Sequence, residues 1–74
     1  MLKISHLDKN SIASVVGLKK NDVIVAFNGD SAKDMLDVAY FDSQSQFNLT
    51  VDRKGEQLTF NLTKDANEAM GWEF

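Results

Sequence analysis

Few residues of this chain have side chains that could do proton-transfer or covalent chemistry. His6 is the only histidine and there is no cysteine, so a catalytic nucleophile would have to use His6 as its base. The sequence offers no partner for this imidazole, and we expect it to be a surface or packing residue. Since no nucleophile–base pair or phosphate-binding loop can be assembled, we predict that the chain itself is not an enzyme.

Three carboxylates lie close together in the sequence and would be oxygen ligands for a metal ion if one helix face held them all. Asp34, Asp37 and Asp42 are three and five residues apart, which does not place them all on one face. The glycine and final glutamate of a calcium-binding EF-hand loop are missing as well. We therefore predict a solvated acidic face, with no metal and no cofactor held by this chain.

The bulk properties predict one small globular domain spanning residues 1–74. A chain of this length buries only about 60% of its unfolded surface, so we expect modest stability. The net charge is −3, from 8 basic and 11 acidic residues, and the basic residues are scattered, which argues against nucleic acid as a partner. No segment stays apolar over the roughly 18 residues of a membrane span. The lack of cysteine fits a cytoplasmic location.

The segment Gly17–Gly29, GLKKNDVIVAFNG, contains the strongest succession of local signals. Its first glycine can end a helix in the left-handed conformation. Val23–Phe27 is an apolar, β-branched run with turn residues on both sides, which predicts a central strand. Asn28-Gly29 then predicts a tight turn.

The clearest strands are expected in the second half of the chain. Gln46–Asp52 and Gln57–Thr63 each alternate apolar with polar residues, at the period of two that strands show. Because the short polar segment Arg53–Glu56 joins them, we predict an antiparallel hairpin with one buried and one solvated face.

A first strand and two short helices complete the expected elements. Leu2–Leu7 is expected to be a strand, and Ser11 or Asn10 to cap a helix through Val16. The second helix should open at Ser31–Asp34, with Ser31 or Asp30 as its cap. Its apolar face would be formed by Met35, Leu36, Val38, Ala39, Tyr40 and Phe41, with Leu36 and Phe41 pointing into the core.

The resulting order β-α-β-α-β-β-(β), with the Gly17–Gly29 pattern in it, resembles that of bacterial PDZ domains. Their usual pattern in this region is a helix of small residues, a glycine with an apolar residue, a turn with Asp, an apolar strand and Asn-Gly. The resemblance implies an α+β fold, namely a small antiparallel barrel or sandwich with two short helices, of the circularly permuted bacterial type. It also implies recognition of peptides rather than catalysis.

The second half resembles one family more closely, the N-terminal PDZ-like domain of bacterial radical-SAM iron–sulfur oxidoreductases. That family typically has D-(L/I)-(L/I)-D-Y-x-(F/Y) in the helix and K-D-x-x-E-x-L-G-L-x-F at the end. Lys33–Phe41, KDMLDVAYF, fits the first motif except that Val38 replaces the usual tyrosine, and Lys64–Phe74, KDANEAMGWEF, fits the second. The resemblance implies that the chain is the leading part of a longer protein, whose cluster-binding cysteines would lie beyond Phe74.

The resemblance also implies where a ligand would bind. PDZ domains add an extended peptide to a sheet edge beside a helix, and a loop of inward-pointing N–H groups receives the ligand's carboxylate. That loop has an apolar-Gly-apolar sequence and leads into the ligand-binding strand. We therefore expect a loop at Ala69, Met70, Gly71 and Trp72, followed by the strand at Glu73 and Phe74. The facing helix would direct one or more of four side chains toward the ligand: Met35, Val38, Ala39 or Asp42.

A mutation follows from this loop assignment. If Gly71 has a positive φ, Gly71→Val should abolish peptide uptake and leave the hairpin folded.

Other interpretations of the C-terminal segment stay open. Met70–Phe74 could be a last strand that closes the barrel, with Gly71 in a bulge, Trp72 in the core and no ligand. Glu68 and Glu73 would place negative charge beside an anion site, and Lys64, the nearby base, could be a surface residue. The groove could also be filled by a later segment of the parent protein or by a second copy, which would make the domain a structural scaffold.

Overall fold

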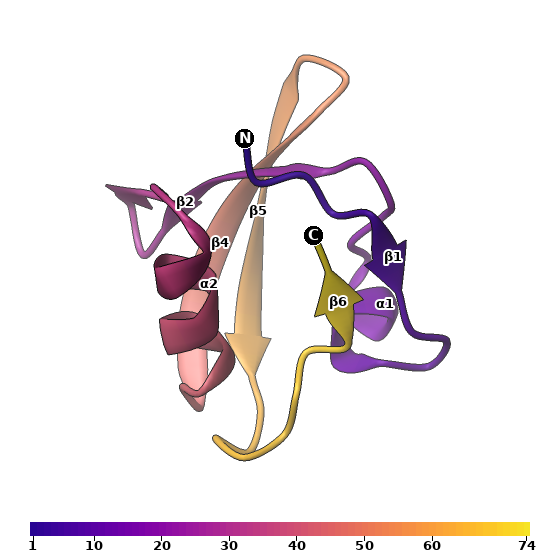
Figure 1. Cartoon of the computed structure of the whole chain (residues 1–74), viewed down its shortest axis with the longest axis vertical. Coiled ribbons are helices and arrows are strands. Elements are labelled where there is room, and N and C mark those ends of the chain that lie inside the picture. Colours follow the sequence, from indigo (N-terminus) through magenta and orange to yellow (C-terminus); the bar gives the residue numbers. More distant parts are fainter.

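Two helices and six strands make up the chain, and the computed structural model describes all of residues 1–74 (Figure 1). In sequence order they are β1 (His6–Leu7), α1 (Ile12–Val16), β2 (Val23–Phe27), β3 (Asp30–Ser31), α2 (Met35–Asp42), β4 (Gln46–Arg53), β5 (Glu56–Thr63) and β6 (Trp72–Glu73). The strands form two antiparallel sheets, one in the order β3-β2-β4-β5 and one of β1 with β6. The predicted α+β class with two short helices is confirmed, but the sheets do not join into a closed barrel. Neither helix has the length and apolar character needed to cross a membrane.

The predicted hairpin is confirmed as β4 and β5, which pair over all eight residues of each strand. Phe47, Leu49 and Val51 point into the core from β4, as the alternation predicts. The connecting turn is Lys54-Gly55, with φ angles of 54° and 88°. Positive φ at both central residues is the type I′ geometry, whose twist matches that of the flanking strands.

Lys54 is a poor residue for this turn, because a side chain with Cβ is strained at positive φ unless it is Asn or Asp. We expect Lys54→Asn to raise the free energy of unfolding by about 0.5–1 kcal/mol. Urea denaturation at neutral pH measures the change. Lys54→Ala, which keeps the strain, is the control and should give no such gain.

Strand β2 is central, as predicted, because it lies between β3 and β4. Its pairing with β4 shifts by one residue between Ile24 and Ala26, so Val25 forms a β-bulge. The turns around this strand also follow the prediction. Gly17 ends α1 in the left-handed conformation with φ 111°, and both Asn28 and Gly29 have positive φ.

The N-terminal segment is not the single strand that the alternation of Leu2–Leu7 predicts. Its first part runs beside β2, where Lys3 pairs with Val23 and the Ile4 N–H donates to Asp22 O at 2.9 Å. The backbone then bends away, and β1 pairs with β6 instead. One continuous pattern is thus divided between two sheets, a choice that depends on neighbours far along the sequence.

Helix α2 begins later and is less amphipathic than predicted. Its N-cap is Asp34, whose Oδ1 accepts from the Leu36 N–H at 3.0 Å, so neither Ser31 nor Asp30 is the cap. Residues 30 and 31 form the short strand β3 instead. Leu36 is 78% exposed rather than in the core, whereas Phe41 stacks on Phe27 with ring centroids 4.5 Å apart, as expected. Apolar residues therefore cover the outer face of α2 as well as the inner one.

An ion pair that the sequence did not reveal joins the first half of the chain to the hairpin. Arg53 donates from Nε and Nη2 to the two carboxylate oxygens of Asp22, each at 2.8 Å, and Nη2 also donates to Gly17 O at 2.9 Å. Asp22 is only 1% exposed. Burial by itself would raise the pKa of Asp22, yet hydrogen bonds from Arg53 and the Lys19 backbone hold that pKa below its ordinary value of 3.8.

The core lies between the four-stranded sheet, α2 and the β1–β6 pair (Figure 1), and it draws side chains from most elements. Its fully or nearly buried members are Leu2, Ile4, Ala13, Leu18, Ile24, Phe27, Val38, Phe47, Leu49, Val51, Leu62 and Met70. Trp72 and Phe74 pack against this cluster from the C-terminal segment.

Candidate functional site

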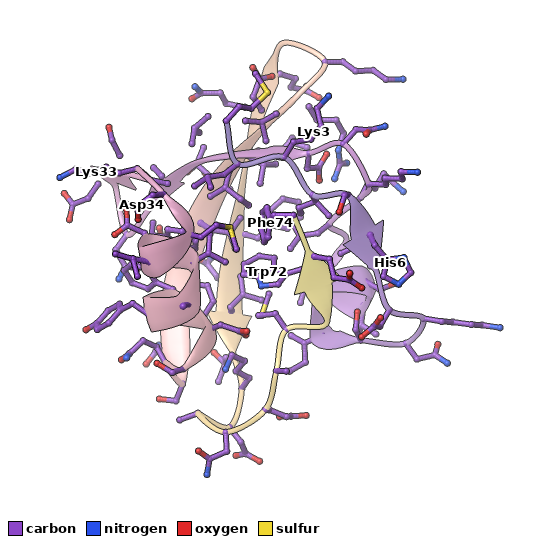
Figure 2. The ribbon with its side chains drawn as sticks, in the orientation of Figure 1. Lys3, His6, Lys33, Asp34, Trp72 and Phe74 are labelled. Atoms are coloured by element: carbon purple, nitrogen blue, oxygen red, sulfur yellow. The ribbon has the colours of Figure 1, made fainter.

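Strand β6 has a neighbouring strand on one side only. It pairs with β1 through His6↔Glu73 and Leu7↔Trp72, and the two form a separate sheet with no third strand. The other edge of β6 faces α2, and the side chains of Trp72 and Phe74 extend into the space between them (Figure 2). A strand edge without a partner has backbone N–H and C=O groups that can pair with another segment. This edge is the first part of the candidate site.

One side of α2 is turned toward β6. Residues advance by about 100° around an α-helix, so Met35, Ala39 and Asp42 lie on one side, and Asp42 contacts the segment before β6. Met35 and Ala39 are exposed there. Val38 is 3% exposed and belongs to the core, so the expectation that its side chain faces a ligand is wrong. Three of the four predicted helix residues, Met35, Ala39 and Asp42, thus form the wall opposite β6.

The predicted loop at residues 69–72 leads directly into β6, but its side chains are not all available to a ligand. Ala69 is exposed, whereas the side chain of Met70 is 0% exposed and fills the core. The backbone is anchored to the first helix and its preceding turn, because the Ala13 N–H donates to Met70 O and the Asp8 N–H to Gly71 O. Gly71 has the positive φ that the sequence suggested, 81°.

The backbone N–H groups of this loop differ in their partners. The Met70 N–H donates to Oδ1 of Asp42 at 2.8 Å, whereas no acceptor within the protein contacts the Gly71 N–H. A carboxylate from α2 thus already occupies one of the donors that the resemblance assigns to a ligand. The second oxygen of Asp42, Oδ2, has no hydrogen-bond partner and is not buried.

Lys64 holds this end of the site together. It is 8% exposed, not the surface residue that the sequence left open. Its Nζ donates to Asp42 O at 2.6 Å and Glu68 O at 2.7 Å, with longer contacts to the carbonyls of Asp65 and Ala66. A cation at these carbonyls satisfies the C-terminal end of α2, where the helix dipole favours positive charge. Lys64 therefore links α2 to the loop that precedes Met70.

Lys64→Met keeps most of the side chain's bulk but removes the donor to these carbonyls. We expect the free energy of unfolding to fall by about 1.5–3 kcal/mol, as for hydrogen bonds to charged groups. Amides of residues 65–70 should exchange faster with solvent than in the unmodified protein, because local opening becomes easier. The control is Lys9→Met, at an exposed lysine without a side-chain hydrogen bond. Unchanged exchange in residues 65–70 would contradict the linking role.

The space between β6 and α2 is not an open groove. Trp72 and Phe74 are half-buried there, with ring centroids 5.2 Å apart, and they pack on the core. The two surface hollows of the molecule are lined by other residues, and neither includes β6, Met35 or Ala39. The free edge of β6 is therefore present, but a bound segment would have to lie over or displace the two aromatic rings.

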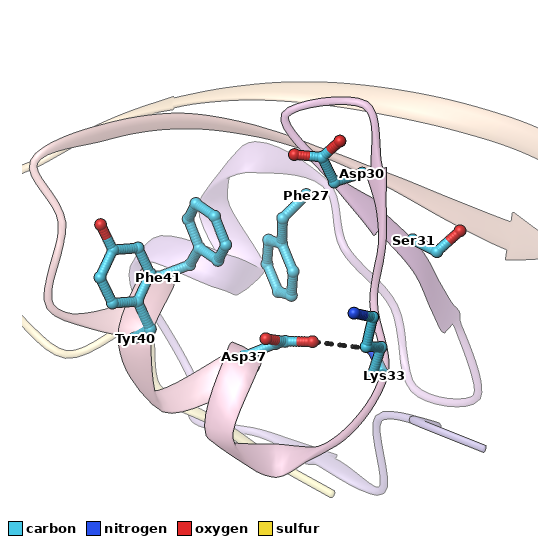
Figure 3. Close-up of a pocket in the computed structure, with 7 residues that line it drawn as sticks. All are labelled: Phe27, Asp30, Ser31, Lys33, Asp37, Tyr40 and Phe41. Atoms are coloured by element: carbon cyan, nitrogen blue, oxygen red, sulfur yellow. Dashed lines mark hydrogen bonds between the residues drawn. The ribbon is translucent and has the colours of Figure 1, made fainter.

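The larger hollow, of about 480 Å³, lies on the other side of α2, against β2 and β3 (Figure 3). The Phe27 and Phe41 rings form its apolar floor, and Asp37 accepts there from the Lys33 N–H at 2.8 Å. The smaller one surrounds the Asp22–Arg53 pair and is lined by polar residues. Nothing in either hollow aligns a nucleophile with a base.

The three carboxylates of the second helix do not form the solvated acidic face that their spacing predicts. Asp34 caps α2, Asp37 accepts from the Lys33 N–H, and Asp42 accepts from the Met70 N–H. Each thus serves a different backbone amide, and they share no ligand position.

A different group, His6, Asp8 and Glu73, brings its ligand atoms within 4.8 Å of one another on the β1–β6 pair. His6 Nε2 is 3.1 Å from Asp8 Oδ1, so this imidazole lies at the surface, as expected, with a carboxylate neighbour. All three side chains are exposed, and such groups are common without an ion, so we assign no metal to them.

Comparison with known proteins adds no relatives to this description. A scan against protein-family models gives no match, and a search of curated proteins finds no similar sequence.

Proposed function

We propose that the chain is a PDZ-like recognition module of the circularly permuted type, which binds an extended peptide or protein segment by strand addition. The observation that carries the proposal is the free edge of β6, a strand with one partner that faces an α-helix. Backbone hydrogen bonds along such an edge supply affinity, and side chains of the neighbouring helix supply specificity. Met35 and Ala39 are the exposed helix residues in position to do so.

The loop before β6 supports this proposal. An apolar-Gly-apolar sequence, Met70-Gly71-Trp72, precedes the strand, and the glycine has a positive φ. The Gly71 N–H has no acceptor within the protein, and Gly71 comes directly before β6. The succession of a short helix, central strand, second helix and hairpin before this loop follows the order that permuted PDZ domains share.

The resemblance extends the proposal to a parent protein. On this proposal the 74 residues are the N-terminal part of a cytoplasmic radical-SAM-type iron–sulfur protein. The sequence contains no cysteine, so its own residues do not fit a cluster, and we assign it no catalytic step. Its part would be to bind or position a protein segment for the rest of that molecule.

An amide-shift titration of the isotope-labelled protein with pools of random octapeptides tests strand addition. Saturable shifts are expected at Trp72–Phe74 and on α2 at Met35 and Ala39. Because Trp72 is the only tryptophan and lies at this edge, its fluorescence should change with the same midpoint.

Two variants on α2 locate the binding. Ala39→Arg places a long charged side chain on the wall facing β6 and should abolish the shifts, while Leu36→Asp on the outer face should leave them intact. Absence of saturable shifts with every pool, or equal loss in the two variants, would exclude binding at this edge.

A second candidate function is supported by the filled space and the outer face of α2. Trp72 and Phe74 cover the inner side, and Leu36 and Tyr40, one turn apart, leave an apolar strip exposed on the outer side. A structural domain that packs against its parent protein or a second copy would have these features. Sedimentation over a range of concentrations tests self-association, which Leu36→Asp should then reduce.

A further inference from the structure

We infer that the segment bound at the β6 edge is an internal stretch of polypeptide, not a free C-terminal end, because the carboxylate of Asp42 already occupies the anion position of the loop. This inference rests on the proposed strand addition. It departs from the carboxylate-binding role that the resemblance assigns to residues 69–72.

The position of Asp42 is the first argument. Its Oδ1 lies 2.8 Å from the Met70 nitrogen, so one member of the row of N–H groups is already paired with a negative charge. The next free donor, the Gly71 N–H, is one peptide unit away, within about 4 Å of the Met70 nitrogen. A ligand carboxylate at Gly71 would therefore lie beside the Asp42 carboxylate, and the two like charges would repel each other.

No cation in the protein forms an ion pair with the Asp42 carboxylate. The only ion pairs within 4.0 Å are His6–Asp8 and Arg53–Asp22, so Asp42 has none. The nearest candidate, Lys64, directs its Nζ to four backbone carbonyls. Glu68 and Glu73 add negative charge to the adjoining loop and strand. A terminal carboxylate at Gly71 would thus meet three acidic residues, Asp42, Glu68 and Glu73, against the single positive charge of Lys64.

The same residue offers a group that an internal segment can use. Oδ2 of Asp42 has no partner within the protein and remains accessible. It can accept a hydrogen bond from a backbone N–H of a ligand whose chain continues past this point. A ligand that ends here in a carboxylate has no further N–H to donate. An internal peptide therefore loses nothing to repulsion and gains an acceptor, so the loop discriminates by charge as well as by hydrogen bonding.

A display library of randomised octapeptides tests the inference. The same octapeptides are presented in two forms. In the first form the octapeptide ends in a free carboxylate, and in the second it is flanked on both sides by Gly-Ser linkers. Selection on the full 74-residue protein should enrich the internal form, and Ala39→Arg, which blocks the edge, should lose the selected sequences.

Synthetic pairs of the selected peptides, with a C-terminal carboxylate or a C-terminal amide, then measure the effect of charge at the loop. The amide should bind about tenfold more tightly than the carboxylate. Asp42→Asn should abolish this preference, because its amide oxygen can still accept from the Met70 N–H while its NH2 faces the ligand as a donor. Leu36→Asp, which adds charge on the outer face of α2, should leave the preference unchanged.

The outcomes separate the inference from the proposed function. Enrichment of the carboxylate form, or equal enrichment of both forms, would overturn the inference while leaving strand addition in place. Failure to enrich either form would overturn both. A preference for the amide that persists in Asp42→Asn would show that Asp42 is not its cause.

Discussion

Replacing Arg53 by leucine is expected to lower the free energy of unfolding by about 3–5 kcal/mol, as when one partner of a buried ion pair is removed. The loss is large because Asp22 is 1% exposed and would keep only the Lys19 N–H as a donor. Gly17 O would lose its contact with the guanidinium as well. A protein of this size is stabilised by only about 4–11 kcal/mol in total, so chemical denaturation should show a much less stable or partly unfolded variant.

A second substitution should restore part of this loss. In Asp22→Asn combined with Arg53→Leu, the amide oxygen can still accept from the Lys19 N–H and no charge is buried without a partner. We therefore expect the double variant to be more stable than Arg53→Leu alone, since the single change is penalised by the uncompensated carboxylate. A double variant with a free energy of unfolding no higher than that of Arg53→Leu would contradict this account.

The pH dependence gives an independent check on the same pair. In the folded protein the pKa of Asp22 lies below its ordinary value of 3.8. Its contribution to stability is therefore present above that value and is lost as the pH falls through it. In Arg53→Leu, burial would instead raise the pKa of Asp22, so protonation would favour the folded state. The difference in stability between the two proteins should shrink as the pH is lowered from 7 toward about 3.

Gly71→Ala is expected to lower the free energy of unfolding by about 2–4 kcal/mol, from backbone strain and from a steric overlap. The φ of 81° is unfavourable for any residue with a Cβ. A Cβ at this position would also lie 2.3 Å from the Cβ of Ser11, which is bonded directly to the backbone. The C-terminal segment and the start of α1 approach too closely here for any side chain at residue 71.

The two causes can be separated with Ser11→Gly. This change removes the atoms that an added Cβ would meet and costs only a few tenths of a kcal/mol as an N-cap substitution. Gly71→Ala in the Ser11→Gly background should then lose about 1–2 kcal/mol, the share due to φ. Thermal denaturation of the four proteins of this cycle measures the coupling. Equal losses in both backgrounds would show that the contact with Ser11 is unimportant.

The close contact between residue 71 and Ser11 also affects which variants can test the loop for binding. The sequence suggested that, if Gly71 has a positive φ, Gly71→Val would abolish peptide uptake and leave the hairpin folded. The positive φ is confirmed, but the contact with Ser11 means that the substitution would disturb the packing of β6 on α1. Ala39→Arg and Asp42→Asn are better probes, because neither residue lies in the tightly packed part of the core.

The elements could be predicted from the sequence wherever a few neighbouring residues decide the conformation. The alternation in Gln46–Asp52 and Gln57–Thr63 was sufficient for the hairpin, and Asn28-Gly29 for the turn after β2. Prediction failed where the pattern was compatible with more than one partner. Leu2–Leu7 alternates like one strand but is divided between two sheets, and α2 is apolar on both faces, so its spacing did not show that Leu36 would be exposed.

The candidate site was found in part. The apolar-Gly-apolar segment before the last strand indicated the loop and the edge, and Met35 and Ala39 do lie on the facing side of α2. The buried positions of Val38 and Met70 were missed, as was the use of Asp42 as a partner for the loop. Asp42 was visible in the sequence as an acidic residue one turn after Ala39, but no neighbouring residue indicates that its carboxylate accepts from the Met70 N–H.

The sequence by itself determined the hairpin, the central strand and the turns around them, because alternation and positive φ act over a few consecutive residues. Only the tertiary structure decided which polar groups meet. Asp22 and Arg53 are 31 residues apart, and Asp42 and Met70 are 28 apart. Their pairing depends on the packing of whole elements, since a carboxylate can accept from any donor that the fold brings within about 3 Å. The acidic side chain at the loop, Asp42, is therefore placed there by the fold and not by the motif.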